Sequence, residues 1–113
     1  MDVIARAKKH FGAIGVQKLE VTEWEDEDGK PTVIHYKPVT LDERQKFRSA
    51  AERDGDVVAY AEVIVAKALN ADGSKMFNIA DKRALRKEVD PDVIRHVALL
   101  MMLVPSVEEM GKD

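Results

Sequence analysis

The chain has 113 residues, a length typical of one domain, and 45% of them are hydrophobic whereas only 5% are aromatic. Its net charge is -3, with basic residues interleaved among acidic ones, which argues against a nucleic-acid partner because phosphate binding needs a concentrated basic field. The absence of cysteine excludes disulfides and thiolate chemistry.

The N-terminal third predicts a helix followed by a β-hairpin. Residues 1–15 form a leading helix, since apolar side chains recur on one helical face until Gly12 and Gly15. Residues 16–39 contain two runs rich in β-branched and aromatic side chains on either side of a polar turn at Asp28-Gly29. These runs are therefore expected to pair as a β-hairpin.

Residues 40–104 are expected to be helical, and their first start signal is a capping box. The Thr40 hydroxyl accepts an unpaired N–H of the first turn, while the Glu43 carboxylate reaches back to the Thr40 N–H. A charged surface helix is expected from Leu41 until the Asp54–Asp56 stretch, where a glycine between two aspartates breaks it.

The segment Val57–Leu69 is apolar at every position except Glu62 and Lys67. A helix here would have almost no polar face, so other elements must cover it on most sides. A buried strand is the alternative, because β-branched residues are frequent. The length of thirteen residues and the interior alanines favour the helix.

A turn is predicted over Asn70–Ser74, where Asp72 and Gly73 suit a positive φ. Phe77 is expected to pack back onto the preceding helix, and Asn78 to cap a helix over 79–89. The turn would then stabilise a helical hairpin.

Asp90 and Pro91 signal the start of a last helix, because proline at the first helical position gives up an N–H that has no partner. This helix is predicted over 91–104 and ends at Pro105, and residues 105–113 form a tail. The sequence thus predicts a single α+β domain, mostly α-helical with an N-terminal β-hairpin. The apolar stripe of the last helix consists of Val93, Ile94, Val97, Ala98, Met101 and Val104.

The search for catalytic or metal-binding residues finds no convincing site. The acidic run at 25–28 fails the calcium-loop pattern, since aligning Gly29 at the sixth position places Trp24 and His35 where carboxylates are required. The histidines lack the spacing of metal ligands, and no serine lies in a nucleophile elbow. We expect no enzyme activity, no metal and no cofactor.

Apolar surface is the remaining functional signal. One side of the Val57–Leu69 helix is expected either to face a partner or to be wrapped completely by the other elements. The two adjacent methionines near the end of the last helix either fill the core or form an adaptable contact surface. The predicted partner contacts are Val58, Val65, Leu69, Met76, Phe77, Met101 and Met102.

The second half of the chain, AYAEVIVAKALNADGSKMFNIADKRALRKEVDPDVIRHVALLMM, contains an apolar helix, a DxDGxxxF-like turn and a PxVIxRI-like final helix. In these features it resembles the tail assembly chaperones of long-tailed bacteriophages. The stretch VTLDERQKF fits the family more loosely. The corresponding positions are Leu69, Asp72, Gly73, Met76, Phe77, Asp81, Leu85, Pro91, Val93 and Ile94.

The resemblance implies a non-enzymatic chaperone, encoded by a phage or prophage, that binds the tape-measure protein and helps recruit tail-tube subunits. Such a protein acts in the bacterial host cytoplasm and is absent from the mature virion. Self-association is a further expectation. No run approaches the roughly 18 apolar residues of a membrane span, so no membrane partner is expected. A structural tail or head-tail component and a small regulatory protein are the alternatives.

Many members of this family also occur in a longer form made by a minus-one ribosomal frameshift. The tripeptide Met110-Gly111-Lys112 can be encoded with the slippery sequence G-GGA-AAR, one residue before the chain stops at Asp113. A glycine codon other than GGA in the gene would contradict this hypothesis.

Overall fold

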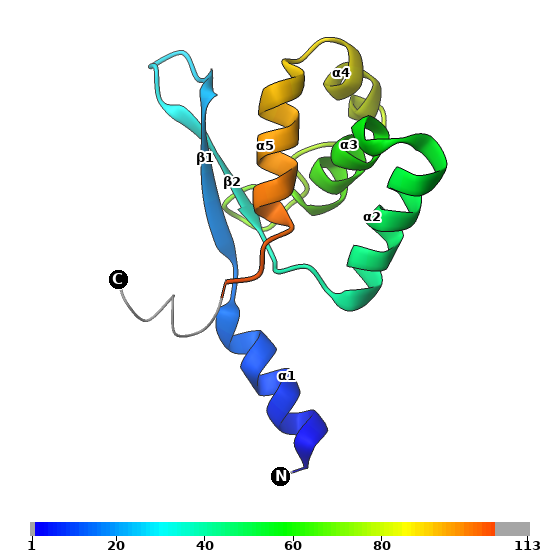
Figure 1. Cartoon of the computed structure of the whole chain (residues 1–113). Coiled ribbons are helices and arrows are strands. Elements are labelled where there is room, and N and C mark those ends of the chain that lie inside the picture. Colours follow the sequence, from blue (N-terminus) through cyan, green and yellow to red (C-terminus); the bar gives the residue numbers. More distant parts are fainter. Residues whose placement is uncertain (1, 106–113) are drawn as a thin grey trace.

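The computed structural model describes residues 2–105 and confirms the predicted α+β fold, mostly helical with an N-terminal hairpin (Figure 1). The frameshift tripeptide and nearly all of the predicted tail lie outside the described residues. The elements in chain order are α1 (Val3–Ile14), β1 (Gln17–Glu25), β2 (Pro31–Tyr36), α2 (Leu41–Asp54), α3 (Asp56–Lys67), α4 (Asp81–Lys87) and α5 (Pro91–Met101).

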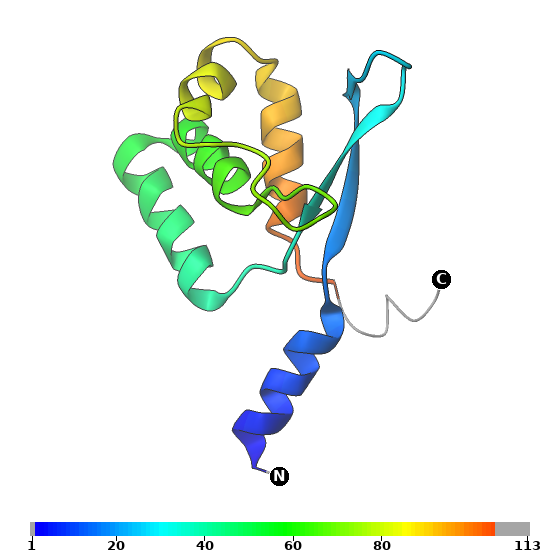
Figure 2. The same ribbon diagram turned by 180° about the vertical axis from the view of Figure 1, so that it is seen from behind.

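The β-hairpin covers one side of α5, and α2 and α3 lie on the other side of it (Figures 1 and 2). β1 and β2 are antiparallel, with Leu19 opposite Ile34, and a bulge interrupts the register between Val21 and Glu25. The acidic run forms the tip of the hairpin, where the Asp26 carboxylate accepts hydrogen bonds from two N–H groups of the turn itself. Asp26 of this run therefore stabilises the turn.

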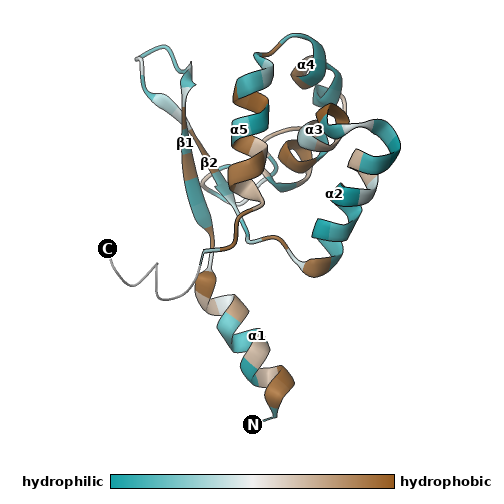
Figure 3. Ribbon diagram, in the orientation of Figure 1, coloured by the Kyte–Doolittle hydropathy of each residue, from teal (hydrophilic) through white to brown (hydrophobic). Residues whose placement is uncertain are grey.

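The helix α3 is the centre of the fold and packs against α2, α4 and α5. The helical interpretation of this segment is confirmed as far as Lys67, and the alternative of a buried strand is wrong there. The predicted end at Leu69 is wrong, because Ala68 has extended backbone and Leu69 pairs with β2. Ile64 is 0% exposed and Ala61 is 1% exposed, so the surrounding helices cover this apolar segment on most sides, as its composition requires. In contrast, α2 is largely hydrophilic (Figure 3) and buries only Phe47 and Ala50.

The predicted capping box begins α2. The Glu43 N–H donates to the Thr40 Oγ1 at 3.1 Å, and the Thr40 N–H donates to the Glu43 Oε1 at 3.0 Å. The helix ends at Gly55, whose φ of 95° is a conformation that favours glycine, and α3 follows at once. This sharp connection lets two consecutive helices pack against each other.

The loop after α3 reaches the open edge of β2, which the sequence does not predict. Leu69 and His35 exchange two backbone hydrogen bonds, of 2.7 and 3.0 Å. The predicted turn then closes through a 2.8 Å bond from the Asn70 N–H to the Ser74 carbonyl, with Gly73 at a φ of 89°. Asp72 accepts bonds from the N–H and hydroxyl of Ser74. The turn therefore ties α3 to the hairpin as well as to the next helix.

Asn78 does not cap α4 as predicted, because α4 begins at Asp81 and the residue before it, Ala80, makes no side-chain cap bond. Instead, Asn78 and Asp81 close the turn before the helix through reciprocal hydrogen bonds. The Asp81 N–H donates to the Asn78 Oδ1 at 3.1 Å, and the Asn78 N–H donates to the Asp81 Oδ2 at 2.8 Å. The helix itself is shorter than the predicted 79–89, because Ile79 and Ala80 form a turn that precedes it.

Asp90 and Pro91 begin α5 as predicted, and the Asp90 carboxylate accepts a 2.9 Å bond from the N–H two residues later. The helix ends at Met101, so the predicted end at Val104 is wrong. The last turn tightens, since the Leu103 N–H donates to the carbonyl only three residues back, and Pro105 disfavours helical geometry in the residue before it.

The helix α1 projects from the rest of the domain and runs through Gly12 to Ile14 (Figures 1 and 2). Its apolar residues Val3 and Ile4 are 68% and 64% exposed. We predict that deleting residues 2–12 shifts the midpoint of thermal unfolding by less than about 4 °C, which corresponds to under about 1 kcal/mol. Circular dichroism measures this shift, and a larger loss would show that α1 packs on the domain in solution.

Candidate functional site

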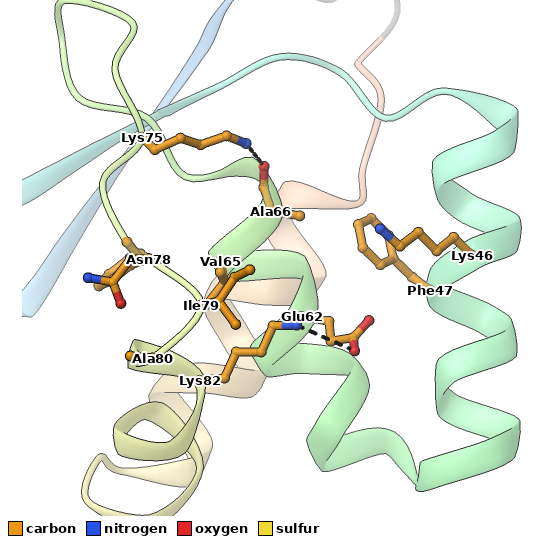
Figure 4. Close-up of a pocket in the computed structure, with 11 residues that line it drawn as sticks. Lys46, Phe47, Glu62, Val65, Ala66, Lys75, Asn78, Ile79, Ala80 and Lys82 are labelled. Atoms are coloured by element: carbon orange, nitrogen blue, oxygen red, sulfur yellow. Dashed lines mark hydrogen bonds and ion pairs between the residues drawn. The ribbon is translucent and has the colours of Figure 1, made fainter.

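A groove of about 770 Å³ lies between α2, α3 and the segment 75–82 (Figure 4). α3 forms its floor, α2 forms one wall, and the segment that leads into α4 forms the other wall. We refer to it as the groove. Its lining residues are Lys46, Phe47, Glu62, Val65, Ala66, Lys75, Phe77, Asn78, Ile79, Ala80 and Lys82.

The lining of the groove is mainly apolar. Val65 is 7% exposed and lies on the floor, Phe47 and Phe77 contribute aromatic side chains, and Ile79 stands at the rim with 77% of its surface exposed. A volume of several hundred Å³ lined by such side chains is typical of sites that bind apolar groups. The groove is therefore suited to accept aliphatic side chains from another molecule.

Charged side chains border this apolar lining. At one end, the Lys82 ammonium lies 3.7 Å from the Glu62 carboxylate, and at the other the Lys75 ammonium donates to the Ala66 carbonyl (Figure 4). Lys46 points from α2 toward the space between the walls. The border thus carries three lysines and one glutamate.

A partly buried ion pair joins α2 and α3 near the groove. The Lys67 side chain is 5% exposed, and its ammonium donates to both carboxylate oxygens of Glu43 at 2.9 and 3.1 Å. Burial by itself would raise the pKa of Glu43, but hydrogen bonds from Thr40 and Lys67 and the charge of Lys67 outweigh it and hold this pKa below its usual range. Glu43 therefore joins the start of α2 to the end of α3.

The low pKa of Glu43 predicts a stability difference that depends on pH. Folding favours the ionised form of Glu43, so this carboxylate stabilises the folded state. The stabilisation is fully present above the ordinary pKa of 4.5 and is lost as pH falls through the lower pKa of the folded state. Glu43→Gln keeps an oxygen for the cap but removes the charge. Urea unfolding should show the wild type more stable than this variant at pH 7 and the two converging at acidic pH. A constant difference across pH would contradict the prediction.

Two of the predicted partner contacts, Val65 and Phe77, line the groove. Met76 packs partly buried against the core, and its N–H donates to the Ala68 carbonyl at 3.1 Å. Leu69 is half-buried where it pairs with β2, and Val58 on α3 is also half-buried. The groove therefore brings together only part of the predicted set.

The two adjacent methionines of the predicted contact set, Met101 and Met102, differ in their exposure. Met101 is 0% exposed, so its interpretation as a contact residue is wrong and it fills the core, as the alternative stated. Met102 is half-buried and lines a second hollow of about 260 Å³ between α2, α3 and α5.

Sequence reasoning missed Phe47, Ile79 and Lys46 as residues of the groove. Phe47 is one of few apolar residues in a charged helix, which is an ordinary signal of core packing. Ile79 was placed inside a helix, whereas it lies in the turn before α4. No local signal would have paired it with α2.

Within residues 2–105, no group of three or more His, Cys, Asp or Glu side chains is arranged to hold a metal ion. No helix in this part of the chain has the length and apolar character needed to cross a membrane.

Comparisons of the chain with models of protein families, with curated proteins and with solved structures find no match. The functional interpretation therefore rests on the groove and on the sequence resemblance described above.

Proposed function

We propose that this protein is a non-enzymatic phage tail assembly chaperone that holds apolar helical segments of the tape-measure protein in the groove. On this proposal it also helps recruit tail-tube subunits, acts in the bacterial host cytoplasm and is absent from the mature virion. The observation that carries the proposal is the open apolar groove bordered by charged side chains. The resemblance of the second half of the chain to tail assembly chaperones supports it.

The energetics of such a groove suit transient binding. Burying one aliphatic side chain contributes about 1.5–3 kcal/mol, so a single anchor gives weak binding and several anchors are needed for a stable complex. Phe47, Val65, Phe77 and Ile79 offer contact area without a fixed pattern of hydrogen-bond donors. A chaperone that covers varied apolar helices needs contacts of this kind.

Co-expression with the tape-measure protein encoded nearby tests the proposal. We expect stable co-purification, and more tape-measure protein in the soluble fraction with this protein than without it. Equal insolubility in both cases, with no co-purification, would contradict a chaperone role for this chain.

A second candidate is a structural tail or head-tail component, and the observation that favours it is α1. This helix leaves Val3, Ile4 and Phe11 exposed on a projecting arm, as subunits of permanent assemblies often do, and it would also support self-association. Mass spectrometry of purified virions separates the candidates. The chaperone proposal predicts no peptides of this chain in the particle, whereas stoichiometric amounts would favour the structural component.

A further inference from the structure

We propose that the groove selects acidic amphipathic helices, in which glutamate or aspartate flanks the apolar residues that enter it. This inference rests on the proposed chaperone function and names the chemistry of the segment that is bound. It follows from how the charges around the groove are paired.

Glu62, the one carboxylate among the residues that line the groove, already has a lysine partner, whereas two lysines of the lining have no carboxylate partner. Glu62 is paired with Lys82, and Glu43 is paired with the buried Lys67. Among residues 2–105, Lys46 forms no ion pair, and the Lys75 ammonium is bound to a backbone carbonyl. An apolar ligand in the groove therefore meets an excess of positive charge.

The excess of positive charge extends beyond one end of the groove. A neighbouring hollow of about 290 Å³ shares Ala66 and Lys75 with the groove, and it is also lined by Lys37 and by the ion pair of Lys67 with Glu43, so Lys37 and Lys75 supply its excess positive charge. This basic region stands out because the whole chain has a net charge of -3. A local field of opposite sign to the whole molecule selects among partners by charge.

The positions of the lysines fit an amphipathic helix. Lys46 points inward from α2, while Lys75 and Lys82 come from the opposite wall at different ends of the groove (Figure 4). A helix with its apolar face on the floor would present its flanking residues to both walls. Carboxylates at those flanks would lie near ammonium groups, whereas lysines there would be repelled.

A second copy of this chain does not fit as the occupant. The helix of this chain that projects with exposed apolar side chains is α1, where Val3 and Ile4 lie on the surface. The charged side chains within α1 are all basic, namely Arg6, Lys8 and Lys9. The like charges of α1 and the border of the groove oppose this docking.

The test uses three synthetic helical peptides with identical leucine and alanine positions and either glutamate, glutamine or lysine at the flanking positions. Binding of each peptide to the full chain is measured by fluorescence anisotropy at low and high salt. We expect the glutamate peptide to bind at least about tenfold more tightly than the lysine peptide at low salt, and the ratio to shrink at high salt.

Variants locate the charge effect. Lys46→Glu should remove most of the preference for the glutamate peptide, while Lys18→Glu, on the exposed face of β1, should leave it unchanged. Equal binding of all three peptides would overturn the charge inference but leave the apolar groove intact. Failure of all three to bind would overturn the inference and remove the groove as the site, whereas co-expression would still test the chaperone function separately.

Discussion

Replacing Ile64 by alanine is expected to lower the free energy of unfolding by about 3–4 kcal/mol, within the range of about 2–5 kcal/mol for such core truncations. Ile64 is 0% exposed and lies on α3, the helix that packs against α2, α4 and α5. Removing the methyl and methylene groups leaves a cavity, and the tightly packed helices around it cannot move enough to fill it. Urea unfolding monitored by circular dichroism measures the loss.

Ile79→Ala is the matched control because it removes the same atoms from a side chain that is 77% exposed. Its effect should stay within about 0.5 kcal/mol. Equal losses for Ile64→Ala and Ile79→Ala would contradict the position of α3 at the centre of the core.

Replacing Glu43 by alanine is expected to lower the free energy of unfolding by about 2–4 kcal/mol. The change removes half of the capping box, and it leaves the ammonium of Lys67, whose side chain is 5% exposed, without its carboxylate. An unpaired buried charge costs about 3–5 kcal/mol, and the 36% exposure of Glu43 lowers this estimate because water can replace part of the lost interaction.

A double-variant cycle separates the cap from the charge. Glu43→Gln alone leaves the charge of Lys67 unpaired, whereas Glu43→Gln combined with Lys67→Met leaves no buried charge. The double variant should therefore be more stable than Glu43→Gln alone, as replacing both partners of a buried pair is often close to neutral. A double variant no more stable than Glu43→Gln alone would contradict this role of the pair.

Local signals predicted the starts of α2 and α5 because capping is local chemistry. Thr40 with Glu43 and Asp90 before Pro91 act over three residues or fewer, so the sequence contains the whole motif. The start of α4 was predicted two residues too early, because Ile79 and Ala80 form a turn before the helix. The end of α5 was harder to predict, since its apolar stripe continues past the point where the backbone tightens before Pro105.

The candidate site was only partly predictable because it depends on tertiary packing. Val65 and Phe77 were found through the apolar pattern of α3 and the turn after it. The same pattern pointed to Met101, since a buried and an exposed methionine look alike in sequence. Lys46 and Ile79 enter the groove only because α2 and the turn before α4 face each other across α3.

The central proposal is that the groove binds the tape-measure protein. The most direct test is to measure how tightly three forms of the chain bind the purified tape-measure protein. The forms are the wild type, Ile79→Ser at the rim of the groove, and Leu41→Ser at the start of α2, where Leu41 is 83% exposed and outside the groove. We predict that Ile79→Ser weakens binding about tenfold while Leu41→Ser leaves it unchanged. Equal affinity of all three forms, or loss of binding only with Leu41→Ser, would contradict the account.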